Sequence, residues 1–258
     1  MKIDEIKRSL KGDLGKEIIF YETTDSTNAA ALDLAEKNRE GLVILSDSQE
    51  KGRGRLGRLW ISPPGVNIYM SIILKPETNP GDATLITLMT AVACSIALRK
   101  ATGLEVRIKW PNDLTVADKK LGGILTELKI YQKKIDFAVV GIGINVNVDT
   151  DSFPEDVREI ATSVKNETGR THSRENIVAE ILNEMNRWYS FFKKTDREAI
   201  LSAWRRLTST LGREVVVTTG RQTHRGFAES IDDDGVLLLR LPSGEVKKIS
   251  SGDLRILK

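Results

Sequence analysis

The stretch EVRIKWPNDLTVADKKLGGILTELKIYQKKIDFAVVGIGINVNV, residues 105–148, decides the fold of this chain. Its runs 105–110, 120–130 and 134–148 are rich in β-branched and other apolar residues, which favour strands. The polar turns ADKK and YQKK lie between these runs. Because antiparallel strands can be joined by such short turns, we predict an antiparallel meander over these residues.

The residues upstream add helices to this sheet. EIIFYE (17–22) and LVILS (42–46) predict strands, and the alanines and leucines of 26–38 have the spacing of a helix between them. NIYMSIIL (67–74) predicts another strand, and a long apolar helix follows at 82–102. We therefore expect an α+β fold in which helices flank a mixed, mostly antiparallel sheet.

The last third of the chain changes character. After a stretch without periodicity (149–163), helices are predicted at 174–193 and 196–210. From there the pattern becomes short strands separated by turns such as DDDG and PSG; the strands are expected at 213–219, 224–231, 235–241, 245–250 and 254–258. This pattern indicates a small SH3-like β-barrel. We predict two domains, 1–210 and 211–258.

Composition excludes several classes of protein. The single Cys94 cannot form an intramolecular disulfide, and two histidines with one cysteine cannot supply an ordinary structural zinc site. The charged N-terminus lacks the apolar run of a secretion signal, and the apolar stretch 85–98 is interrupted by polar residues. We expect a cytoplasmic protein without a membrane span. A net charge of +3 is too small to argue for nucleic acid.

The segment 47–66 is a long loop rich in glycine and arginine. GRGRLGR (52–58) satisfies G-x-G-x-x-G, but it leads into a strand, whereas a dinucleotide fingerprint opens a helix. The chain also lacks the H-R-D and D-F-G motifs of kinases. What remains is a loop whose cations, with no evident partners in the sequence, suit a phosphate or an acyl-phosphate. A solvated basic turn or a nucleic-acid patch is the alternative.

Five motifs together carry a family resemblance. TTDSTNAAA (23–31), SQEKGRGRLGRLWISPPGVNIYMSI (48–72), KWPNDL (109–114), KLGGILTEL (120–128) and GIGINVN (141–147) resemble the biotin protein ligase family in order and spacing. The resemblance implies a class II synthetase-like catalytic domain with a C-terminal SH3-like barrel. It also implies that ATP activates biotin as biotinyl-5'-AMP, which then acylates a lysine of a biotin carboxyl carrier protein.

The same resemblance bears on partners. Some family members carry an N-terminal helix-turn-helix domain that represses transcription; here DSTN already stands at 25–28, so we expect that function to be missing. Neither nucleic acid nor a membrane is expected as a partner, and a homodimer stays open. A lipoate-type ligase of the same fold and a nucleic-acid-binding module that uses the basic loop are the alternative functions.

For the biotin head group, the resemblance implies contacts from DSTN. Ser26, Thr27 and Asn28 would bind the ureido end, and Gln49 would add another contact. Hydroxyls and amides suit a neutral urea that both donates and accepts hydrogen bonds. The plain alternative is that Asp25 or Ser26 only caps the helix.

The GRGR loop would cover the bound ligand. By the resemblance, Arg53, Gly54 and Arg55 lie at the biotin carboxylate and the phosphate, with Arg58 nearby on the ATP side. Trp60 would lie against adenine; without the resemblance it is an ordinary core tryptophan.

The meander would supply the remaining residues. Lys120 would bridge the biotin carboxylate and the ATP α-phosphate, although Lys119 beside it leaves the register open. Gly122 and Gly123 would let the strand lie against the valeryl chain and thiophane ring. Asn145 would bind the adenosine side. Asp113 would lie near Mg²⁺ and pyrophosphate, unless it is only a turn residue.

The residue inventory favours charge stabilisation over covalent catalysis. Neither histidine falls in these motifs, and Cys94 lies within the apolar helix. Attack of a carboxylate on the α-phosphorus of ATP needs mainly alignment and cations, and we expect Lys120 and Arg55 to supply both.

Overall fold

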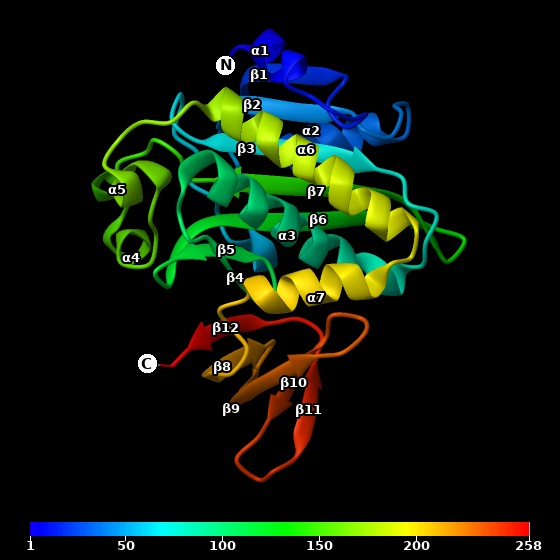
Figure 1. Ribbon diagram of the computed structural model, residues 1–258, viewed down its shortest axis with the longest axis vertical. Coiled ribbons are helices and arrows are strands. Elements are labelled where there is room, and N and C mark those ends of the chain that lie inside the picture. Colours follow the sequence, from blue (N-terminus) through cyan, green and yellow to red (C-terminus); the bar gives the residue numbers. More distant parts are fainter. Residues whose placement is uncertain (258) are drawn as a thin grey trace.

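A computed structural model describes residues 1–257, which form two sheets and their covering helices (Figure 1). The larger sheet has seven strands in the order β1-β2-β3-β7-β6-β5-β4. Only β1 and β2 are parallel; the remaining neighbours are antiparallel. Its strands are β1 (Ile18–Thr24), β2 (Val43–Gln49), β3 (Ile68–Leu74), β4 (Arg107–Lys109), β5 (Asp113–Val116), β6 (Lys119–Tyr131) and β7 (Lys134–Ile144).

Helices cover both faces of this sheet unequally. One face is covered by α3 (Ala83–Thr102) and α6 (Arg174–Lys193), which pack on each other, while α7 (Arg197–Leu207) packs on α3. The opposite face holds α2 (Thr27–Ala35), which lies on β2, β3 and β7. The short helices are α1 (Ile3–Arg8), α4 (Glu155–Arg158), α5 (Val164–Thr168) and the 3-10 turns η1 (Arg55–Gly57), η2 (Pro80–Asp82) and η3 (Thr150–Ser152).

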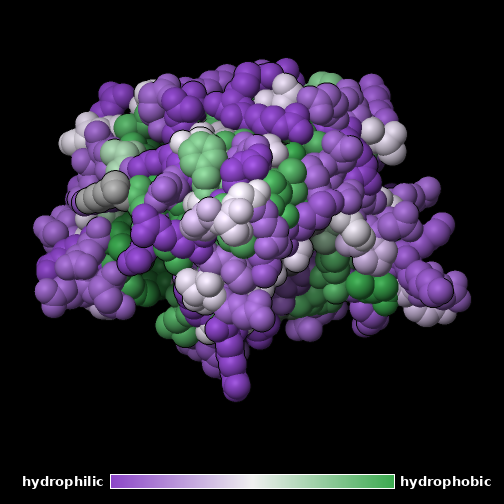
Figure 2. Space-filling view, turned by 90° about the horizontal axis from the view of Figure 1, so that it is seen from below, coloured by the Kyte–Doolittle hydropathy of each residue, from purple (hydrophilic) through white to green (hydrophobic). Residues whose placement is uncertain are grey.

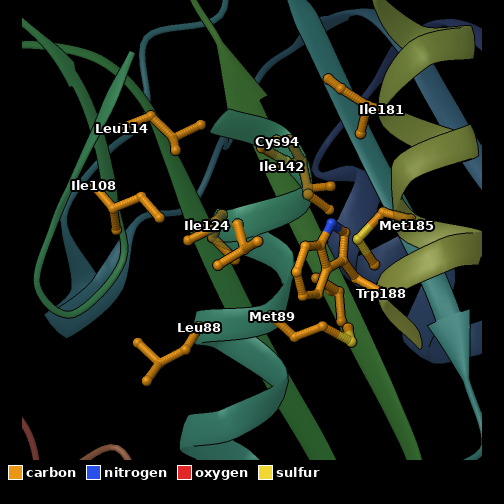
Figure 3. Packing of buried hydrophobic residues seen from close by; sticks show 14 of the residues in the cluster. Leu88, Met89, Cys94, Ile108, Leu114, Ile124, Ile142, Ile181, Met185 and Trp188 are labelled. Carbon is orange, nitrogen blue, oxygen red and sulfur yellow. The ribbon is translucent and has the colours of Figure 1, made fainter. Parts of the chain in front are cut away.

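The main core lies between the sheet and α3 and α6. In Figure 3, Met185 and Trp188 of α6 and Met89 of α3 surround the same space as Ile124 and Ile142 of the sheet. The apolar residues of α6 recur at three- and four-residue steps, so one stripe of the helix is buried. The alternate residues of β7 from Ala138 to Ile144 also point into this core.

A long apolar helix belongs to this core. Of the helices in residues 1–257, one, at Pro80–Thr102, is long and apolar enough to cross a membrane by length and composition. The share of its most apolar window that is buried inside the protein is 72%. It therefore serves as the central core helix, closed at its C-terminus by Gly103 in the left-handed conformation.

The smaller sheet is antiparallel and has the order β11-β10-β9-β8-β12, and it lies in the region where the SH3-like barrel was expected. Its strands are β8 (Glu214–Thr219), β9 (Gln222–Ile231), β10 (Leu237–Arg240), β11 (Val246–Ile249) and β12 (Asp253–Ile256). It packs on the larger part through Trp110, whose Nε1 donates to the Gly235 carbonyl at 3.3 Å. Arg197 of α7 also pairs with Asp82 and with Asp234, which lies in the turn between β9 and β10.

The α+β fold and the antiparallel meander were predicted correctly, but the meander has four strands. Sequence patterns missed β5, because its four residues follow a Pro-Asn pair that is typical of turns. The last strand ends at Ile144, not at residue 148. The stretch 149–163, expected without regular structure, contains η3 and α4, and neither α1 nor α5 was expected.

Candidate active site

A cavity of about 770 Å³ opens on the α2 face of the large sheet. Its walls come from the start of α2, the loop that follows β2, strands β6 and β7, the segment around α4 and the start of β12. Segments far apart in the sequence therefore meet at one place, and every motif of the sequence analysis contributes to it.

Glycines make the floor of this cavity. Along β7 the side chains of Phe137 and Val139 pack under α2, and the next residues on the same face are Gly141, Gly143 and Asn145, which line the cavity. Beyond the part of β7 that α2 covers, this face of the strand has glycines in place of large side chains. This alternation leaves a flat backbone surface on which a ligand can lie.

Only one glycine of the predicted pair in β6 faces the cavity. Gly123 lies opposite Gly143 and lines the cavity, but a Cβ on Gly122 would point at Ile144 and Leu114 in the core. Neighbours along a strand face opposite sides, so Gly122 has its open side toward the core, and a contact of its backbone with the ligand stays a prediction. Gly141 and Gly143, which do line the cavity, were missed, although the period of two in GIGIN could have found them.

Trp60 lies directly on the glycine floor. A Cβ on Gly143 would come within 2.7 Å of Trp60 Cε2, so only glycine allows this approach. Lys120 Nζ lies 5.5 Å from the centroid of the indole ring, and Trp60 Nε1 has no hydrogen-bond partner among the described residues. Trp60 is thus a wall of the cavity and not a core tryptophan.

Lys120 is held by a carboxylate. Its Nζ lies 2.7 Å from Asp113 Oδ1, and Lys109 Nζ approaches the other oxygen, Oδ2, at 3.6 Å. Lys119 is exposed, whereas the Lys120 side chain is 32% exposed and lines the cavity, which fixes the register. Lys109 was missed as a site residue, although it belongs to the KWPND motif.

The donor set does not fit a resident magnesium ion. Both oxygens of Asp113 face lysines, and residues 1–257 contain no group of three His, Cys, Asp or Glu side chains that could hold a metal. Mg²⁺ prefers octahedral oxygen ligands and is commonly bound by one or two carboxylates together with substrate phosphates. Any Mg²⁺ would therefore arrive with a phosphate ligand, and the metal role of Asp113 stays a prediction.

The basic loop is tied to its surroundings, contrary to the expectation of unpaired cations. Arg55 donates to Asn112 Oδ1 at 2.8 Å, and Asn112 in turn donates to the Ile124 carbonyl at 2.8 Å. Burial lowers the pKa of the Arg55 guanidinium, which stays charged because an arginine pKa is so high. Lys51 pairs with Asp25 at 2.8 Å. These bonds hold the loop before any ligand is considered.

Arg58 reaches the smaller sheet. Its two terminal nitrogens donate to the two oxygens of Asp253 at 3.2 and 2.7 Å, and both residues line the cavity. Hydrogen bonding from Arg58 lowers the pKa of the Asp253 carboxyl. Arg53, in contrast, is exposed and has no side-chain partner in the part of the chain that the structure describes. The C-terminal sheet is therefore part of the site.

The start of α2 forms a polar wall. Ser26 occupies the N-cap position, but its side chain makes no capping hydrogen bond within the described residues although it is 2% exposed. Ser26 is therefore the N-cap residue by position but, in residues 1–257, makes no capping hydrogen bond with its side chain, so its hydroxyl is available to a ligand. The backbone N–H and the hydroxyl of Thr27 both donate to Gln49 Oε1, at 2.8 and 3.2 Å.

Asn28 lines the cavity and is also bonded inside the protein. Its amide donates to Glu127 Oε2 at 2.7 Å and to the Leu125 carbonyl at 3.2 Å, and its oxygen accepts from Ser71 at 2.6 Å. Both amide hydrogens are thus used inside the protein. Glu127 and Ser71 were not identified from the sequence, because the residue that they contact, Asn28, is distant from both along the chain.

Exposed apolar side chains surround the mouth. Leu56 and Leu59 of the loop and Ile160 after α4 are 74%, 75% and 61% exposed, and all three line the cavity. Seen from below, hydrophobic residues gather in patches between hydrophilic ones (Figure 2). Asn145, deeper in the cavity, donates to the Thr162 carbonyl at 3.0 Å and so ties the floor to the segment after α4.

The arrangement suits a ligand with an anionic end and a neutral polar end. Lys120, Lys109, Arg55 and Arg58 place four cations at one end of the cavity, and Ser26, Thr27 and Gln49 place uncharged donors and acceptors at the other. The glycine floor and Trp60 lie between them. Such cations stabilise charge that develops on phosphate oxygens.

Comparison with known proteins agrees with this arrangement. Residues 20–145 match the Biotin/lipoate A/B protein ligase family, and residues 210–254 match the Biotin protein ligase C terminal domain. The bifunctional ligase/repressor BirA of Bacillus spizizenii is 35% identical over 254 residues, which are 98% of this chain and 78% of that protein. The biotin (acetyl-CoA-carboxylase) ligase of Paracoccus denitrificans is 34% identical over 86% of this chain and 93% of its own length.

A solved structure also matches along nearly the whole chain. The biotin protein ligase from Aquifex aeolicus in complex with biotin and ATP superimposes with a TM-score of 0.80 at 30% identity, over 94% of this chain and all of that one. These relatives support neither the lipoate-type alternative nor the nucleic-acid-binding module. The chain belongs to the biotin protein ligase family.

Proposed function

We propose that this chain activates biotin with ATP as biotinyl-5'-AMP and transfers the biotinyl group to a lysine of a biotin carboxyl carrier protein. The observation that carries the proposal is Lys120, which lies against Asp113 and over Trp60, where the glycine floor meets the cationic end of the cavity. The match to the Aquifex aeolicus ligase, a complex with biotin and ATP, supports the choice of ligands.

Biotin would lie along the floor with its ureido end at α2. Ser26, Thr27 and Gln49 would bind the ureido group, because their hydroxyls and amide line the polar end of the cavity. Gly123, Gly141 and Gly143 would lie under the apolar part of the ligand, since they leave room for it.

The phosphates would occupy the cationic end. Lys120 would bridge the biotin carboxylate and the α-phosphate, with Asp113 holding its ammonium in place. Arg55 and Arg53, with Gly54, would cover the reacting groups from the loop, and Arg58 would lie on the ATP side. Trp60 and Asn145 would contact the adenosine.

The chemistry needs two steps. In the first, a biotin carboxylate oxygen attacks the α-phosphorus and pyrophosphate leaves, so the cations stabilise the charge that moves onto the leaving oxygens. In the second, the neutral amine of the acceptor lysine attacks the acyl carbon, AMP leaves and the amine loses a proton. A closed loop is needed in between, because a mixed anhydride reacts with water.

The acceptor lysine of a carrier protein is the partner in this proposal, and neither nucleic acid nor a membrane takes part. We propose that the protein acts in the cytoplasm, where ATP is available. Whether the chain forms a homodimer would be measured by sedimentation. We also propose that residues 1–210 are the catalytic domain and 211–258 the SH3-like domain. The change from the large to the small sheet between α7 and β8 supports this division.

One assay tests the whole proposal. The protein is incubated with biotin, ATP and Mg²⁺, and biotinyl-5'-AMP is measured by mass; a carrier domain is then added and its mass followed. We expect the adenylate first and the acylated carrier second. Absence of the adenylate while lipoate is activated would favour the other ligase chemistry instead.

Gly143→Ala should raise the KM for biotin about tenfold, because its Cβ would lie 2.7 Å from Trp60 Cε2 and must displace the ring into the ligand space. Gly81→Ala is the matched control, because Gly81 does not line the cavity and its Cβ would meet nothing within 4 Å in the described part of the chain. Steady-state pyrophosphate release gives both constants; equal KM values for the two variants would contradict the account of the floor.

Asp253→Asn should raise the KM for ATP by no more than about fivefold, because an exposed ion pair is worth up to about 1 kcal/mol. Arg58 would lose the carboxylate that holds it at the cavity, while the biotin end stays intact. Glu214→Gln removes a similar exposed pair, with Arg225, from the same small sheet and should change neither KM. A larger change in the KM for biotin than for ATP would place Asp253 elsewhere in the mechanism.

A further inference from the structure

Two residues that do not line the cavity stand directly behind its polar wall. Glu127 of β6 and Ser71 of β3 both bond to Asn28, which lines the cavity and is 3% exposed. Ser71 is fully buried and Glu127 is half-buried. None of the steps described above uses Glu127, so its carboxylate needs a reason to be there.

The carboxylate decides which way the Asn28 amide points. An ionised carboxylate only accepts hydrogen bonds, so at 2.7 Å it must face the NH₂ group of Asn28 and not its oxygen. The Leu125 carbonyl also only accepts, and it takes the second hydrogen at 3.2 Å. A flipped amide would place its oxygen against two acceptors, which costs free energy on both contacts.

The orientation leaves the amide oxygen on the floor of the cavity. Asn28 Oδ1 would lie 2.1 Å from a Cβ on Gly141, nearer than the amide nitrogen at 3.0 Å, and Gly141 lines the cavity. Ser71 donates to this oxygen, and a carbonyl oxygen has two lone pairs. One acceptor site on Oδ1 therefore stays open beside Ser26 and Thr27.

We propose that Glu127 is a positioning residue that locks the Asn28 amide with its oxygen toward the cavity, so that the head-group end selects ligands with an N–H donor. The inference rests on the proposed function, since the ureido ring of biotin supplies such donors. The neighbouring Thr27 agrees, because its hydroxyl donates to Gln49 Oε1. Ser71 lies 2.8 Å from the Thr27 oxygen, but its one proton goes to the nearer Asn28 Oδ1 at 2.6 Å, so the Thr27 oxygen is also left as an acceptor.

The test compares biotin with an analogue in which one ureido nitrogen is replaced by oxygen. Both are assayed for adenylate formation by the full chain. Wild type should prefer biotin by at least about a hundredfold, because a site built around a ligand N–H is left unpaired by the analogue. Glu127→Gln can donate as well as accept, so both amide orientations become possible and the preference should fall about tenfold. The kcat for biotin at saturation should stay within about twofold.

A paired substitution separates positioning from folding. In N28D/E127Q, the new amide donates to the new carboxylate, so an oxygen again faces the cavity. This variant should regain most of the preference, whereas Asn28→Asp alone, with two carboxylates face to face, should be worse than either. Glu36→Gln, which removes an exposed pair with Lys129, is the control and should match wild type.

The outcomes are distinct. A preference that is unchanged in Glu127→Gln, or N28D/E127Q no better than Asn28→Asp, overturns the positioning role. If Glu127→Gln does not fold, as judged by thermal unfolding, the paired variant alone decides in the same way. Wild type that makes no adenylate from biotin defeats the proposed function and not only this inference.

Discussion

Lys120→Ala should lower the rate of adenylate formation about a hundred- to a thousandfold while the protein stays folded. The Lys120 ammonium lies 2.7 Å from Asp113 Oδ1 and over the Trp60 ring. No other lysine that lines the cavity, among the described residues, makes both contacts. Its charge is placed where the carboxylate and the α-phosphate must meet. Its side chain is partly exposed at the start of β6, so its loss removes little packing.

The measurement is single-turnover pyrophosphate release with saturating biotin and ATP, with thermal unfolding in parallel. Lys120→Arg should recover only a part of the rate, because a planar guanidinium cannot replace a compact ammonium between two oxygens and Asp113. Lys119→Ala is the matched control, since the neighbouring lysine is exposed on the other side of the strand. A wild-type rate in folded Lys120→Ala would remove Lys120 from the reacting centre.

Arg55→Gly should release biotinyl-5'-AMP about a hundredfold faster than wild type while biotin and ATP are still consumed. The substitution removes the hydrogen bond to Asn112, which anchors the loop to β6 through the Ile124 carbonyl, and it adds backbone freedom. Loss of one part-buried, charge-assisted hydrogen bond costs about 1.5–3 kcal/mol, which corresponds to about 10- to 150-fold in rate and so includes the expected change.

Released adenylate would acylate exposed lysines on unrelated proteins. The experiment therefore adds a bystander protein with the carrier domain and follows both masses over time. Lys51→Ala, which breaks the exposed pair with Asp25 in the same loop, should label only the carrier. If Arg55→Gly makes no adenylate, Arg55 acts at the reacting centre and not chiefly as an anchor. If it retains the adenylate, the loop does not seal the site.

The parts of the fold that depend on local patterns could be predicted from the sequence. The alternation in β7 and the helical spacing of α3 and α6 are properties of neighbouring residues, so the elements and the α+β class followed from them. β5 could not be found in this way. A run of only four residues carries too weak a pattern, and its Pro-Asn start indicates a turn.

The site divides along the same line. The motifs identified Ser26, Gln49, Lys120 and Asn145, and all four line one cavity. Each of them could be found because it lies within a recognisable local motif. The partners of those residues were hidden: Asp253 lies 195 positions from Arg58, and Glu127 lies 99 from Asn28. Local spacing says nothing about such pairs, so the loop cations were expected to be free.

The position of Trp60 also gives the protein an optical property. Trp110, Trp188 and Trp204 are at most 6% exposed in the core, whereas Trp60 lies at the cavity wall with the Lys120 ammonium over its ring. Indole emission depends on nearby charge and on water, so a ligand that enters between them changes the signal of one fluorophore against a constant background of three. Intrinsic tryptophan fluorescence therefore reports how many molecules are occupied, without a label and before any turnover.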